Sequence, residues 1–108
     1  MAKLERQING NFDDVLSKIH DAVMDSGVSA DIEDGSDWSS WGTRCAVRVY
    51  ERYSAIGGNR VSMNVTLVGE GDRLFLSAIT SGGSQAMFFK INTWGEDAFL
   101  DCLRDLEL

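Results

Sequence analysis

The stretch from Thr43 to Asn92, TRCAVRVYERYSAIGGNRVSMNVTLVGEGDRLFLSAITSGGSQAMFFKIN, decides the fold. It divides into runs of β-branched, aromatic and alternating apolar residues, which are typical of strands. The predicted strands are Thr43–Tyr53, Arg60–Val68, Arg73–Thr80 and Met87–Asn92. The predicted connectors, each bearing glycine, are Ser54–Asn59, Gly69–Asp72 and Ser81–Gln85. Consecutive strands joined by short connectors favour an antiparallel meander.

Alternation within the strands predicts which side chains are buried. A strict alternation indicates a sheet with one packed face and one face open to solvent or to a partner. The strand from Leu74 to Ile79 is apolar on both sides, so we expect it to be central or covered twice. The side chains expected to face the core from the two preceding strands are Cys45, Val47, Val49, Val61, Met63, Val65 and Leu67.

Two helices are expected to flank the strands. Asn11 has the character of an N-cap, apolar residues then recur at helical spacing from Phe12 to Met24, and Gly27 is a natural C′ residue. Thr93 and Glu96 form a capping box before a final apolar stripe that includes Phe99 and Leu103.

Further strands are expected around the first helix. Lys3–Ile8 is expected to be a short first strand, and Val28–Glu33 a half-buried strand. Asp34–Gly42 is expected to be a polar loop that carries Trp38 and Trp41.

These elements predict an α+β fold in a single domain, residues 1–108. Its order is β-α-β5-α, with an antiparallel β-sheet meander and two helices on one face. This order is similar to that of the TATA-binding-protein-like fold and, more loosely, to that of the helix-grip fold. The likeness rests on element order alone and implies no functional residue.

The sequence itself resembles a family of small uncharacterised bacterial proteins, known only as a domain of unknown function. The resemblance covers most of the chain, and its distinctive segments are VRVYERYS, Val47 to Ser54, and SGGSQA, Ser81 to Ala86. No activity accompanies the resemblance, so it implies no catalytic residue.

Composition narrows the classes of function. The net charge of −7 disfavours non-specific nucleic-acid binding. The stretch Thr43–Asn92 is an exception, because it holds six bases against three acids, whereas the rest holds four bases against fourteen acids. We expect no membrane-spanning segment and no signal peptide, and we expect Cys45 and Cys102 to be buried, reduced thiols in a cytoplasmic protein.

Glycine-rich connectors at one end of the meander are a candidate ligand site. Successive glycine amides can form an anion-binding concavity, although hairpin turns need glycine for geometry alone. Both interpretations stay open. The residues concerned are Gly57, Gly58, Asn59, Ser81, Gly82, Gly83, Ser84 and Gln85.

The outer face of the sheet is a candidate interface, because arginine and tyrosine are enriched at protein interfaces. A solvated face with cross-strand pairs is the alternative. Trp38, Trp41 and Trp94 are expected either to close the end of the core or to form an exposed aromatic site. The residues expected to project from the outer face are Arg44, Arg48, Tyr50, Arg52, Arg60, Asn64, Phe88 and Lys90.

Enzyme chemistry has little support in the sequence. The single histidine, His20, is expected at the surface, and no spacing of His, Cys, Asp or Glu predicts a metal site or a cofactor. We therefore expect a non-enzymatic interaction module that self-associates as a homo-oligomer through the outer sheet face. The alternative is a small-ligand binder that holds an anion at the glycine-rich connectors or an apolar ligand between helices and sheet.

Overall fold

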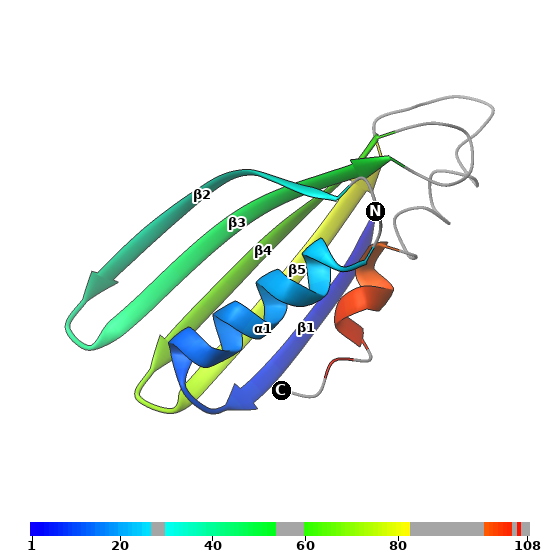
Figure 1. Cartoon of the computed structure of the whole chain (residues 1–108). Helices are drawn as coiled ribbons and strands as arrows, with labels where there is room; N and C mark the ends of the chain where they lie inside the picture. The colour runs from blue at the N-terminus through cyan, green and yellow to red at the C-terminus, as the bar shows by residue number, and fades with distance from the viewer. Residues whose placement is uncertain (27–29, 54–59, 83–98, 105, 107–108) are drawn as a thin grey trace.

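The strands form one open antiparallel sheet of five strands in the order β1-β5-β4-β3-β2 (Figure 1). The computed structural model describes residues 1–26, 30–53, 60–82, 99–104 and 106. Residues 99–104 are helical. The remaining elements are β1 (Ala2–Asn9), α1 (Phe12–Met24), β2 (Asp31–Ser40), β3 (Thr43–Tyr53), β4 (Arg60–Glu70) and β5 (Arg73–Gly82).

The connections agree with the predicted α+β class. Strands β2 to β5 follow one another as a meander, and β1 pairs with β5 on the far side. The predicted strand Met87–Asn92 lies outside the described residues, so the described order after α1 holds four strands rather than five.

Both helical segments pack on the same side of the sheet, which we call the covered face (Figure 1). Helix α1 buries Phe12, Val15, Ile19 and Val23, the apolar positions that recur at helical spacing. The side chains of Phe99, Leu100 and Leu103 join the same core. The strand residues fully buried beneath them are Tyr50, Val61, Met63, Val65, Leu67, Leu76, Ala78 and Thr80.

The predicted start of the helix is confirmed. The side chain of Asn11 accepts a hydrogen bond of 3.0 Å from the backbone N–H of Asp14, which satisfies one of the unpaired amides of the first turn. Asp13 and Asp14 follow in that turn, where the helix dipole favours acids.

Strand β3 faces the opposite way from the prediction. Its register with β4 places Tyr50 opposite Met63 and Ala46 opposite Leu67, so Tyr50 and Ala46 lie on the covered face. The alternating Arg44, Arg48 and Arg52 therefore lie on that face too, and the expectation that these arginines and Tyr50 project from the outer face is wrong. The predicted core residues Cys45, Val47 and Val49 lie instead on the opposite side, the uncovered face.

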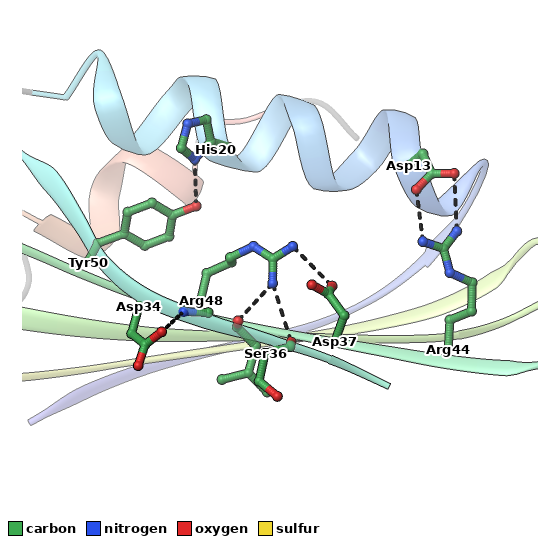
Figure 2. A network of polar contacts seen from close by, with 10 residues as sticks. Asp13, His20, Asp34, Ser36, Asp37, Arg44, Arg48 and Tyr50 are labelled. Carbon is green, nitrogen blue, oxygen red and sulfur yellow. Dashed lines mark hydrogen bonds and ion pairs between the residues drawn. The ribbon is translucent and has the colours of Figure 1, made fainter. Parts of the chain in front are cut away.

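Arginines fit the covered face because their stems pack while their guanidinium groups reach the rim of the helices. The guanidinium of Arg44 lies 4.2 Å from the centre of the Phe12 ring and pairs with the Asp13 carboxylate at 2.9 Å (Figure 2). The guanidinium of Arg52 lies 4.6 Å from the centre of the Phe99 ring. These arginines therefore attach the two helical segments to β3.

Arg48 lies across the neighbouring strand β2. It donates to the carbonyl oxygens of Val47 and Ser36 and pairs with the Asp37 carboxylate at 3.0 Å (Figure 2). A Cβ atom on Gly35 would stand 3.0 Å from the Cδ atom of Arg48, so glycine at that position permits the close approach.

Strand β2 contradicts two predictions. Asp34–Ser40, expected to be a loop, is strand, and no residue of β2 is buried. Backbone pairing with β3 holds β2 in place, so the strand needs no buried side chains. Its sequence therefore lacks the alternation of apolar and polar residues that marks a half-buried strand. Trp41 and Gly42 form the two-residue connection to β3, with φ of 54° and 84°. Positive φ at both positions is the pattern of a type I′ hairpin turn.

Cys45 and Cys102 are free, as predicted, but each is only half-buried. Burial raises the pKa of the Cys102 thiol to about 11, and the positive charge of the neighbouring Arg52 acts in the opposite direction. Cys45 lies on the uncovered face, between Trp38 and Val68 in the register.

Two neighbouring substitutions test the orientation of β4. Val65 is fully buried, so Val65→Asp places an unpaired carboxylate in the core at a cost of about 3–5 kcal/mol, out of about 5–15 kcal/mol of total stability. Thr66 lies on the uncovered face, and Thr66→Asp should leave the fold intact. Thermal unfolding compares the two variants, and equal losses of stability would contradict the orientation.

The two thiols should differ in reactivity, because the thiolate is the reactive form. With a pKa of about 11, Cys102 is about one part in a thousand thiolate at pH 8, and its labelling should accelerate about tenfold for each unit of pH up to that value. Labelling of Cys45→Ser and Cys102→Ala variants with a disulfide reagent isolates each thiol. Slower labelling of Cys45 than of Cys102 in protein dilute enough to be monomeric would show that the assigned faces are wrong.

Candidate functional site

The uncovered face is the candidate functional site, because no described helix or strand lies over it. The register aligns residues of neighbouring strands into rows across this face. One row is apolar over four strands: Phe75 lies opposite Val68, Val68 opposite Cys45, and Cys45 opposite Trp38. Such a contiguous exposed apolar surface typically marks a site of interaction.

The centre of this face carries no charge. It consists of three residues from each of the inner strands β5, β4 and β3. Six of the nine are apolar, and Phe75 and Ile79 keep 37% and 40% of their surface exposed. We call this set the uncharged centre: Phe75, Ser77, Ile79, Asn64, Thr66, Val68, Cys45, Val47 and Val49.

Charged side chains surround the uncharged centre. On β1, Lys3 and Glu5 are 3.5 Å apart. Where β4 begins, Arg60 pairs with Glu51 of β3 and, at 3.5 Å, with Glu33 of β2. A charge-depleted centre within a polar rim is the usual anatomy of a protein interface.

Of the residues predicted to form the interface, Arg60 and Asn64 lie on the uncovered face. Phe88 and Lys90 lie outside the described residues, and the other four are on the covered face. Sequence reasoning missed Phe75 and Ile79, although a signal was present. Both belong to the strand that is apolar on two sides, and the described helical segments cover only one of those sides.

The predicted glycine-rich site falls mostly outside the described residues. Ser81 and Gly82 are the last residues of β5 and pair with Ser62 and Val61. The other six residues, Gly57, Gly58, Asn59, Gly83, Ser84 and Gln85, are not described, so an anion site there stays a prediction.

Trp38 and Trp41 are exposed by 60% and 99%, so neither closes the core. Trp94 lies outside the described residues. The two described tryptophans belong to the β2–β3 hairpin, Trp38 within β2 and Trp41 at its tip.

His20 is not the surface residue that was expected. It is half-buried, and its Nδ1 atom is 3.0 Å from the hydroxyl oxygen of Tyr50 (Figure 2). Burial raises the pKa of Tyr50, and desolvation lowers the pKa of Arg52. The raised pKa of Cys102 leaves its thiol protonated at neutral pH, which does not suit a nucleophile. The contact between His20 and Tyr50 joins α1 to β3.

The described residues form neither a cluster of metal ligands nor a membrane-spanning helix. No group of three or more His, Cys, Asp or Glu side chains is placed to hold a metal ion there. Within the same residues, no helix has the length and apolar character needed to cross a membrane.

Comparison with known proteins gives a family without an assigned activity. No curated protein and no solved structure matches the chain. A family model matches residues 1–106, and the chain therefore belongs to the family of unknown function DUF6054.

Proposed function

We propose that this protein is a non-enzymatic interaction module that self-associates by packing the uncovered face against that of a second copy. The uncharged centre carries the proposal. Phe75 and Ile79 are exposed there, the other four apolar side chains are half-buried, and no described helix covers this side of the sheet. Packing two such faces together buries this surface, and apolar burial is the dominant favourable term in most protein association.

The charge distribution suits a second copy. The protein has a net charge of −7, so two copies repel each other wherever their acidic surfaces meet. The uncharged centre allows contact without a directly opposed pair of like charges. Two copies related by a two-fold axis would bring the same patch together, and sheets that pack in this way lie about 10 Å apart.

The location of the protein forms part of the same proposal. Two free thiols, Cys45 and Cys102, suit a reducing compartment such as the cytoplasm. The bacterial origin and the TATA-binding-protein-like arrangement remain predictions from the sequence.

A small-ligand binder is the second candidate. A hollow of about 330 Å³ lies where the end of β4 and the start of β5 adjoin β1 and β3. Gln7, Asn9 and Arg73 supply polar groups around the apolar side chains of Val68 and Phe75. Native mass spectrometry of the freshly purified protein should show a retained mass if this hollow holds a ligand, and the bare chain mass if it does not.

Self-association is tested with a matched pair of substitutions. Ile79 and Ile32 are exposed by 40% and 39%, but Ile79 lies in the uncharged centre, whereas Ile32 is opposite Tyr50 on the covered side. Ile79→Lys should weaken dimerisation about tenfold or more, since it places like charges in a desolvated contact. Ile32→Lys should leave dimerisation unchanged.

Sedimentation equilibrium measures both variants and the wild type. A wild-type protein that stays monomeric at high micromolar concentration would remove the proposal. Equal weakening by Ile32→Lys would assign the association to a different surface.

A further inference from the structure

Strand β2 forms a long edge of the sheet formed by the described strands. It runs for ten residues and pairs through one side only, with β3. In an antiparallel strand, alternate residues point their N–H and C=O groups away from the neighbour, and at an edge those groups have no partner strand. Among the described residues, none pairs with this outer side of β2.

Two residue types that commonly protect an edge strand are absent from β2. The segment Asp31–Ser40 contains neither proline nor lysine. Its one irregularity lies between Ile32 and Asp34, and from Asp34 to Ser40 the register with β3 is continuous. The N–H groups of Ile32 and Gly35 already donate to the carboxylates of Asp31 and Asp34, so the regular template for another strand is the segment from Ser36 to Ser40.

The charge of β2 determines which strand can add to it. The strand holds four acids, Asp31, Glu33, Asp34 and Asp37, and no base. Glu33 and Asp37 pair with arginines, while Asp31 and Asp34 form no ion pair within the described part of the chain. A second copy of β2 would bring acids against acids, whereas a basic segment would be attracted.

The hairpin also exposes two aromatic side chains that the fold does not use. Trp41 is 99% exposed and holds a φ of 54°, a left-handed conformation that is costly for a bulky residue. Neither packing nor backbone preference therefore favours tryptophan at this position. Tryptophan is enriched among the residues that dominate binding energy, and Trp38, 60% exposed, lies three residues away.

We propose that β2 binds an extended polypeptide segment rich in lysine or arginine, which adds to the sheet as a further strand beside β2. Backbone hydrogen bonds along the free edge provide the attachment. The acids of β2 select a basic segment, and Trp38 and Trp41 contact its side chains. This site is separate from the uncharged centre, so it does not depend on self-association.

The test uses ten-residue peptides that alternate lysine with threonine or valine. Added to ¹⁵N-labelled protein, the lysine peptide should slow amide hydrogen exchange along β2 at least tenfold, because new hydrogen bonds protect the outward-facing amides. Two control peptides separate the contribution of backbone hydrogen bonds from that of charge. A peptide with the same lysines but N-methylated at alternate residues lacks the donors, and a glutamate version reverses the charge. Both should bind at least tenfold more weakly.

Protein variants add independent readouts. Trp41→Asn supplies the Asn-Gly pair preferred in this turn, so it should keep or raise the melting temperature while weakening peptide binding several-fold. Ile79→Lys should bind the peptide as the wild type does, which distinguishes this edge from the uncovered face.

Three results would overturn the proposal. The first is no protection of β2 at millimolar peptide. The second is equal binding of the N-methylated peptide, which would show attraction by charge alone. The third is protection confined to β1, the other edge of the sheet.

Discussion

The register between β3 and β4 is the constraint on which the rest of the structure depends. Because side chains alternate along a strand, a shift of one residue would exchange the two faces of β3. The observed register sets Tyr50 opposite Met63 and Arg48 opposite Val65. Tyr50 thereby meets His20 of α1, and the arginines reach the helices and β2. The same alternation leaves Val47 and Val49 on the face that no described helix covers.

This division of side chains gives the sheet two different recognition surfaces. The uncovered face is apolar and uncharged at its centre, so a second copy meets no opposed like charge there. The free edge of β2 is acidic, so a second copy is repelled and a basic strand is attracted. The two surfaces therefore suit different partners, and they adjoin at Trp38, which belongs to the apolar row of the uncovered face and to β2. The arginines of β3 contribute to neither surface directly, since they hold the helices and β2 in place.

Much of the fold was predictable where one physical signal dominated. The alternation of β4 identified Val65 and Leu67 as buried, and the Asn11 cap located the start of α1. Strand β3 was not predictable from alternation, because valines occupy one side and long arginine stems, with Tyr50, occupy the other. Either side can pack, and only the pairing with β4 decides. Most of strand β2 was predicted to be a loop, because a strand held by backbone pairing with one neighbour needs no alternation of apolar residues. The uncharged centre combines residues from three strands, and their alignment across the sheet follows only from the register in which those strands pair.

Solvent accessibility of individual methyl groups tests this account most directly. A soluble gadolinium complex relaxes the methyl signals that it can approach. In dilute protein we expect strong relaxation of Val47, Val49 and Ile79 and little relaxation of Val61 and Val65, with the first group becoming protected as the protein is concentrated. Protection of Val47 and Val49 at every concentration, with no change at Ile79, would contradict both the orientation of β3 and the association of the uncovered faces.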